Sequence, residues 1–215
     1  RDITDREQAE AERRRRSAEL ETLHQASQQL LAAGLDPEAT YAAVHRAVAR
    51  LMPCEAFAIV LVEESGDVSH AVYLYDQEGR WPDQRLSPGQ GLSGYVISRG
   101  ESVLINNATT DLDVPLVQFG TELSVRSVLG VPFRSDGAVS GALLTETYES
   151  GAFTEHHRLL LETLAAQFSS TIRNAYLHQR EQAHMHEMSL ITSVSASLRT
   201  ADTRAEMPTV ILDQL

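Results

Sequence analysis

Apolar positions spaced three and four residues apart predict a long helix at the start of the chain. No proline or glycine interrupts the stretch from Asp5 to Ala33, and Gly34 then ends it. The residues with coiled-coil spacing are Leu20, Leu23, Ser27 and Leu30. A second helix is predicted over residues 36–51, because Asp36-Pro37 supplies an N-cap and a first-position proline ahead of an apolar stripe.

The pattern then changes to short apolar runs separated by turn residues, which is typical of strands. Five strands are predicted, over residues 57–62, 71–75, 102–105, 124–133 and 138–147. Asp136-Gly137 between the last two indicates a hairpin, and Pro132 suggests an edge position or a bulge late in its strand. We therefore expect an α+β fold, with an antiparallel sheet of five or six strands and helices before and after it.

A second long helix is predicted from Glu155 onward. Its apolar stripe continues beyond Tyr176 only in polar form, through Met185 and Leu190. Because neither long helix can bury its stripe alone past the domain edge, we expect a parallel homodimer. The residues expected at its interface are Leu20, Leu23, Leu30, Leu161, Leu164, Phe168 and Ile172. The alternative is a monomer with exposed helical linkers.

Gly89, Gly91 and Gly94 match the spacing of a dinucleotide-binding loop. That motif requires the first glycine to follow a hydrophobic strand, whereas residues 81–88 form a polar stretch with two prolines, interpreted as a loop. We therefore expect the glycines to turn this loop into a short helix over residues 92–98. The alternative is a nucleotide-binding enzyme domain that uses this loop.

Composition and charge exclude several classes of function. All 18 basic residues are arginine, so there is no lysine for a P-loop, a kinase site or a Schiff base. The net charge of -12 opposes nucleic-acid binding. Cys54 is the only cysteine, which excludes an internal disulfide and a thiolate metal cluster. With no long apolar run and no leader sequence, we expect a cytoplasmic segment with no membrane span and no metal site.

Two segments together resemble the GAF domain, a small-molecule sensor module of bacterial signalling proteins. They are GQGLSGYVISRGESVLINN, which resembles the glycine-helix-strand part of that domain, and residues 127–177, which resemble its last hairpin and closing helix. The resemblance covers residues 20–180. It implies a ligand pocket between the sheet and residues 106–123, for a ligand that the sequence does not identify. Candidate ligand-binding residues are Tyr95, Asn106, Phe119, Arg126, Ser127 and Thr145.

Ligands known for the family are disfavoured one by one. The cyclic-nucleotide members carry an Asn-Lys pair and a Phe-x-x-x-Asp-Glu motif, whereas this chain lacks lysine and Phe119 precedes Gly-Thr-Glu-Leu-Ser. Bilin attachment requires a cysteine in the pocket, and Cys54 precedes the first strand. Haem requires an axial ligand, and His70 on a hairpin arm is interpreted as a surface residue. The methionine-sulfoxide reductase relatives rely on several cysteines.

The resemblance also predicts a domain organisation. The opening Arg1-Asp2-Ile3-Thr4 is similar to the end of a PAS domain, and a weak repeat at an offset of 168 residues suggests that a second GAF domain begins near the C-terminus. The expected parts are residues 1–4 (PAS end), 5–33 (linker helix), 34–176 (GAF domain), 177–198 (linker helix) and 199–215 (second GAF start).

We expect a non-catalytic sensory and relay module of a signal-transduction protein, which either binds a small molecule or acts only as a dimerisation spacer. The output domain implied is a histidine kinase, with a diguanylate cyclase or a phosphatase as alternatives. His186-Glu187 resembles the phosphoacceptor pair of histidine kinases, although the following Met-Ser-Leu-Ile departs from that motif.

Overall fold

The computed structural model describes residues 2–34, 36–63, 66, 68–108, 110 and 124–200, with side chains from residue 10 onward except at 11, 15, 30, 31 and 197–200. The helices are α1 (Asp2–Ala33), α2 (Pro37–Leu51), α3 (Gly91–Arg99) and α4 (Glu155–Thr200). The strands are β1 (Ala56–Val62), β2 (Ser69–Asp76), β3 (Gly79–Trp81), β4 (Gln84–Leu86), β5 (Val103–Ile105), β6 (Ser127–Ser135) and β7 (Ala138–Thr147).

Seven strands form one sheet in the order β3-β2-β1-β7-β6-β5, with β4 also paired to β2. Every strand pairing in the described residues is antiparallel, which confirms the predicted α+β class. Strands β3 and β4 were not predicted from the sequence, since residues 81–88 were expected to form a loop. Both strands have three residues, and each pairs with β2 alone.

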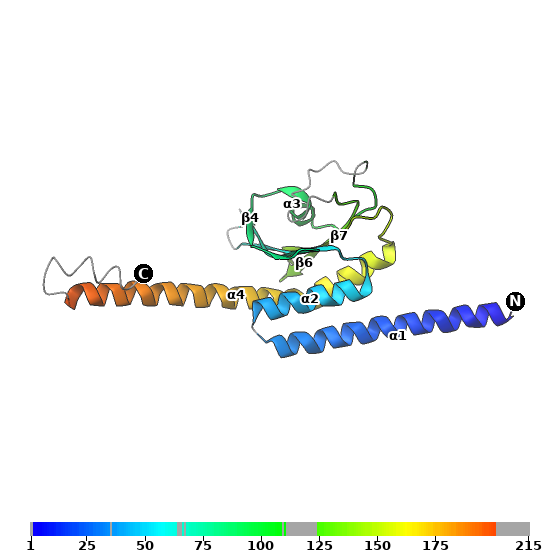
Figure 1. Ribbon diagram of the computed structural model, residues 1–215, viewed down its shortest axis with the longest axis horizontal. Helices are drawn as coiled ribbons and strands as arrows, with labels where there is room; N and C mark the ends of the chain where they lie inside the picture. The colour runs from blue at the N-terminus through cyan, green and yellow to red at the C-terminus, as the bar shows by residue number, and fades with distance from the viewer. Residues whose placement is uncertain are drawn as a thin grey trace.

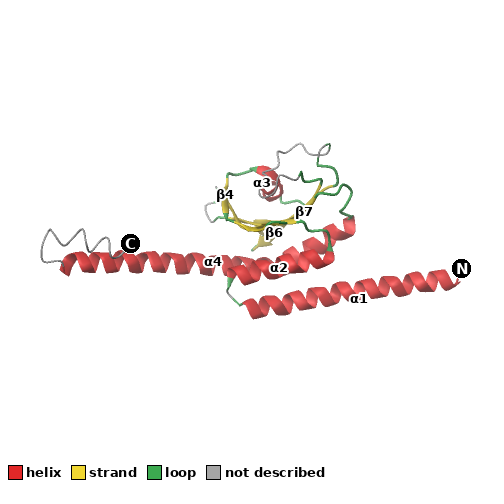
Figure 2. Cartoon of the chain, viewed as in Figure 1, coloured by secondary structure: helices red, strands yellow, loops and turns green. Residues whose placement is uncertain are grey.

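The sheet separates two layers of helix. On one face lie α2 and α4, with α1 packed against α2, whereas α3 covers the opposite face (Figures 1 and 2). Helix α4 is a single helix of 46 residues, so no break separates the domain from its exit linker at residue 177. It extends well past the sheet, as does α1 in the other direction (Figure 1).

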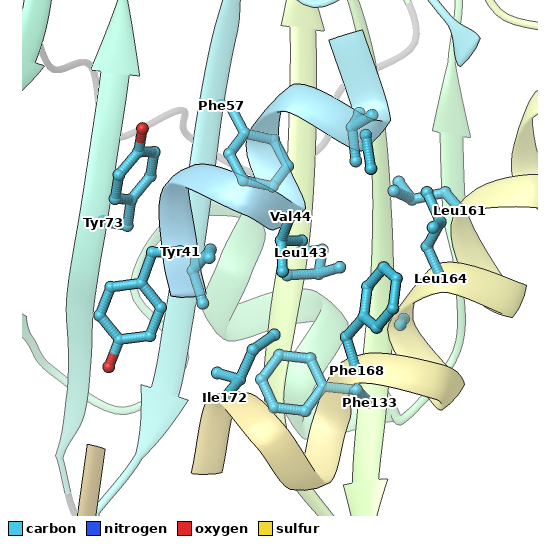
Figure 3. Close-up of a cluster of buried hydrophobic side chains, with 14 of the residues drawn as sticks. Tyr41, Val44, Phe57, Tyr73, Phe133, Leu143, Leu161, Leu164, Phe168 and Ile172 are labelled. Atoms are coloured by element: carbon cyan, nitrogen blue, oxygen red, sulfur yellow. The ribbon is translucent and has the colours of Figure 1, made fainter. Parts of the chain in front are cut away.

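The larger hydrophobic core lies between the sheet and the pair α2 and α4 (Figure 3). The residues that form this core are set by the spacing of side chains in each element. Every second residue of a strand and every third or fourth residue of a helix faces the same interior. On α2, Asp36 accepts a hydrogen bond from the N–H of Ala39 at 3.2 Å, as expected of an N-cap. The largest fully buried side chains include Tyr41, Phe57, Phe133 and Phe168.

Four residues expected at a dimer interface belong to this core instead. Leu161, Leu164 and Ile172 are 0% exposed and Phe168 is 2% exposed, and Figure 3 shows all four facing the sheet. The predicted interface was wrong here because a stripe at coiled-coil spacing packs equally well on a sheet. On α1, Leu23 is partly buried against the core, Leu20 is 67% exposed, and the side chain of Leu30 lies outside the described set.

The glycine motif shapes the turn into α3, as the sequence analysis proposed. Gly89 and Gly91 have φ of +71° and +66°, a region that favours glycine. A Cβ on Gly94 would lie 2.4 Å from the carbonyl carbon of Gly89, so only glycine allows the helix to approach the loop this closely. The strand before α3 is β4, and the one after it, β5, lies at the opposite edge of the sheet. This topology differs from the βαβ unit of a dinucleotide site.

Candidate functional site

A cavity lies on the α3 side of the sheet. It is lined by Ala58, Val60, Ala71, Leu74, Gln84, Leu86, Leu92, Ser93, Leu144 and Glu146, which come from β1, β2, β4, β7 and α3. The cavity is partly open to solvent, and its enclosed volume is about 40 Å³. A volume of this size holds a few waters or the buried part of a small ligand.

Small side chains on the sheet account for the cavity. Ala58 on β1 and Ala71 on β2 are 5% and 1% exposed and present only methyl groups to this space. Leucines on β2, β4, α3 and β7 form the walls and belong to the second apolar cluster of the protein. Strand β7 contributes Leu144 and Glu146, two residues apart, because alternate residues of a strand face the same side.

Glu146, which is of intermediate exposure, brings a carboxylate to these apolar surroundings. Its side chain has no hydrogen bond or ion pair with any described residue, and burial raises its pKa from the usual 4.5 to about 7. Burial alone causes the shift, because an apolar environment disfavours the charged form. Perturbed carboxyl groups of this kind are concentrated at functional sites.

Two further polar side chains line the same cavity. Ser93 on α3 is 8% exposed, and Gln84 on β4 is of intermediate exposure. Like Glu146, neither side chain hydrogen-bonds to another residue within the described part of the chain. Gln84 and Glu146 are of intermediate exposure, so with no protein partner among the described residues all three can hydrogen-bond to water or to a ligand.

Asn106 and Ser127 were predicted to bind a ligand, and the structure joins them as a structural clip. The amide of Asn106 donates to the carbonyl of Phe153 at 2.8 Å and accepts from the N–H of Phe153 at 3.0 Å. The hydroxyl of Ser127, which is 0% exposed, lies 3.1 Å from the carbonyl oxygen of Asn106 and 2.7 Å from that of Glu149. These bonds hold the β7–α4 loop against β5 and β6.

The other candidates are dispersed. Thr145 is fully buried on the helix-packed face of β7 and donates to the carbonyl of Pro53 at 2.9 Å. Tyr95 on α3 packs under the guanidinium of Arg99, 4.7 Å from the ring centre. Arg126 is exposed, and Phe119 lies outside the described residues. None of the five described candidates lines the cavity, so their role in binding stays a prediction.

The cavity residues Gln84, Ser93 and Glu146 were not among the ligand-binding residues predicted from the sequence. Glu146 had a usable signal, since an acid two residues after Leu144 occupies an inward position of a buried strand. Gln84 had no such signal, because the strand that carries it was itself read as a loop.

Next to the cavity, a charged network connects β4 to the helices of the other face. Asp83 precedes Gln84 and accepts from the guanidinium of Arg80 at 2.8 Å. Arg80 also donates to Glu38 on α2 at 2.9 Å. Asp83 lies 3.7 Å from Nε2 of His70, and the His70 ring packs against Tyr176 of α4 at 6.0 Å.

The described residues offer no reactive thiol and no metal site. Burial raises the pKa of the Cys54 thiol to about 12, so the thiol stays protonated and unreactive at neutral pH. Over the described residues, no three His, Cys, Asp or Glu side chains come together as a metal site. Likewise, none of the described helices is long and apolar enough to cross a bilayer.

Comparisons with known proteins give a consistent picture. A family model described as GAF domain matches residues 34–173, whereas no curated protein matches the chain. The GAF domain from an Acinetobacter phosphoenolpyruvate-protein phosphotransferase is 24% identical, with a TM-score of 0.62 over 76% of this chain and 98% of that chain.

Two further solved structures share the fold. Free methionine-R-sulfoxide reductase from Neisseria meningitidis, in complex with its substrate, is 22% identical, with a TM-score of 0.57 over 74% of this chain and 91% of that chain. The A. Aeolicus nlh2 GAF domain in an inactive state is 15% identical, with a TM-score of 0.56 over 74% of this chain and 98% of that chain. At these identities the likeness concerns the fold alone.

Proposed function

Because the chain belongs to the GAF domain family, we propose that it is a sensory module that binds a small molecule in the cavity beneath α3. GAF domains are generally non-catalytic regulatory domains of signalling proteins, and the cavity has the character of a ligand site. Its walls are apolar, and a few polar groups converge on one space. The observation that carries the proposal is the set of three polar side chains, Gln84, Ser93 and Glu146, that lack partners among the described residues.

Binding without catalysis fits the chemistry of the chain. One structural neighbour, the N. meningitidis reductase, was solved with its substrate bound. Reduction of a sulfoxide by thiols that ends in a disulfide needs two cysteines. This chain has one, Cys54, and its thiol is protonated at neutral pH.

Filling the cavity tests this function. Leucine in place of Ala58 would occupy space that a ligand needs, whereas leucine in place of Ala138, which is exposed on β7, leaves the cavity unchanged. We expect small molecules that co-purify with the wild type and A138L, detected by native mass spectrometry, to be absent from A58L. Equal ligand retention by a folded A58L would place the ligand elsewhere and refute the proposal.

We further propose that occupancy is relayed to α4 through the network at Asp83. A ligand touching Gln84 shifts the neighbouring Asp83, which lies close to Arg80 and His70, and His70 packs on Tyr176 of α4. A ligand biases α4 only through a different affinity for two arrangements of this contact. In Asp83→Asn, we expect ligand binding to persist while ligand-dependent hydrogen exchange in residues 177–196 disappears. Exchange that still responds in D83N would contradict the relay.

A homodimer is proposed through the part of α4 beyond the sheet. The apolar side chains exposed there are Leu177, Met185, Met188, Leu190 and Ile191, between 36% and 60% exposed. Leu177, Met185, Met188 and Ile191 lie toward one side of the helix, where exposed apolar side chains mark an interaction site, and a second copy of α4 packed along that side would cover them. Ile191→Glu should yield monomers in sedimentation equilibrium, whereas Ser189→Glu, on the opposite side of the helix, should not. A wild-type monomer at high micromolar concentration would refute the dimer.

The output of the whole protein is also a proposal. A long helix leaving a sensory domain suits a dimeric enzyme such as a histidine kinase, with a diguanylate cyclase or a phosphatase as the alternatives. A PAS domain before residue 5 and a second GAF domain from residue 199 belong to the same proposal. The genomic sequence on either side of these residues tests it directly, because an open reading frame encoding neither kind of domain would exclude this arrangement.

A further inference from the structure

The polar groups of the cavity are mainly hydrogen-bond acceptors, and one of them is acidic. Glu146 has two carboxylate oxygens, Gln84 has an amide oxygen, and Ser93 has a hydroxyl oxygen. Glu146 is the only ionisable side chain among the described residues that line the space. Within this set there is no arginine or histidine to receive an anion.

From this arrangement we propose that the cavity is specific for a small organic cation, an alkylammonium whose nitrogen contacts Glu146 and whose hydrocarbon part lies among the leucines. The proposal rests on the proposed function of the cavity as a ligand site. A primary ammonium has three N–H donors, and Glu146, Gln84 and Ser93 offer acceptors for all of them. Leu74, Leu86 and Leu92 surround the rest of the ligand with apolar surface.

Other classes of ligand fit less well. An anion would have to approach the carboxylate of Glu146 with no basic group to balance it among the described residues that line the cavity, and like charges in an apolar site repel strongly. A metal ion prefers several oxygen ligands with charge, whereas the described cavity residues include one carboxylate. The net charge of -12 also raises the local concentration of cations over anions.

Binding of a cation should also depend on pH, because only ionised Glu146 pairs with it. The elements packed around this carboxylate contribute no other titratable side chain to the cavity within the described residues. The thiol of Cys54 lies nearby, just before β1. Burial, together with the charges of Glu55 and Glu146, raises the pKa of this thiol to about 12, so the thiol remains neutral in this pH range. Affinity should therefore fall about tenfold for each pH unit below the pKa of Glu146 and stay level above it.

Three probes that share a four-carbon chain and differ in charge test the inference: n-butylammonium, n-butanol and n-butyrate. The fluorescence of Trp81, the single tryptophan, reports binding because its side chain packs against the cluster that forms the cavity. The shift in melting temperature gives a second readout. At pH 8.5 we expect n-butylammonium to bind at least tenfold more tightly than n-butanol, and n-butyrate to show no saturable binding.

Glu146→Gln separates the charge of the side chain from its shape. In E146Q we expect n-butylammonium and n-butanol to bind within about threefold of each other, and the pH dependence to vanish. Glu149→Gln, a nearby exposed carboxylate, should leave the wild-type preference unchanged.

Each other outcome overturns part of the account. If n-butanol binds as well as n-butylammonium to the wild type, the cavity is a ligand site and the cation preference is wrong. The same holds if E146Q keeps that preference. If none of the three probes binds, the alkylammonium assignment fails, and ligand loss in A58L then decides separately whether the cavity binds any small molecule.

Discussion

Glu146→Gln should stabilise the empty protein, and by an amount that grows with pH. In the folded state burial raises the pKa of this carboxyl from 4.5 to about 7, so the unfolded chain loses the proton first. The wild type therefore loses stability as pH rises from 4.5 to 7, and the loss is complete above 7. At about 1.4 kcal/mol per pH unit, the whole effect is at most about 3 kcal/mol, and it is smaller to the extent that water reaches this partly exposed carboxylate.

Glutamine has the shape of a protonated glutamate and does not titrate. The free energy of unfolding of E146Q should therefore match that of the wild type near pH 4.5 and exceed it at pH 8.5 by about 1–3 kcal/mol. Urea denaturation followed by circular dichroism at four pH values measures the difference. A difference that is independent of pH, or a less stable E146Q at pH 8.5, would show that the carboxylate has a partner or is solvated. Glu149→Gln, at an exposed position, should give a flat difference throughout.

Three substitutions elsewhere test the fold. Gly94→Ala places a methyl group 2.4 Å from the Gly89 carbonyl carbon and should cost about 1–3 kcal/mol in denaturation experiments; an unchanged midpoint would mean that α3 sits further from the loop. Phe168→Ala removes a ring that is 2% exposed and should cost about 3–5 kcal/mol, whereas a loss under about 1 kcal/mol would place the ring outside the core. Asn106→Ala removes both hydrogen bonds to Phe153 and should cost about 1–3 kcal/mol in thermal unfolding, whereas an unchanged midpoint would mean that this clip does not hold the loop.

The sequence predicted the elements that carry strong periodic signals. The helices α1, α2 and α4 and the long strands β6 and β7 agree with their apolar spacing, and Asp136-Gly137 forms the expected turn, with φ of +52° and +83°. The structure also explains why β6 tolerates a proline at position 132. Strand β5 pairs with β6 only as far as Gly130, so the missing N–H of this proline faces no neighbouring strand, and a bulge follows at Phe133.

The partner of an apolar stripe could not be read from its spacing. Leu161, Leu164, Phe168 and Ile172 have the spacing of a coiled coil, but their partner is the sheet, because a helix buries the same stripe against any apolar surface. The predicted ligand-binding residues Ser127 and Thr145 were misplaced for a similar reason. Ser127 and Thr145 lie on the helix-packed face of their strands, and a polar residue in a strand does not by itself reveal which face binds a ligand.

The central claim is that a small organic cation binds beneath α3, and methyl NMR tests it most directly. In protein labelled at alanine and leucine methyl groups, titration with n-butylammonium at pH 8.5 should cause saturable shifts at Ala58, Ala71, Leu86, Leu92 and Leu144, which line the cavity. Methyl groups of the other core, such as those of Leu161 and Leu164, should stay in place. Shifts confined to exposed groups such as Leu159, or no saturable shift at the cavity methyls, would contradict the account.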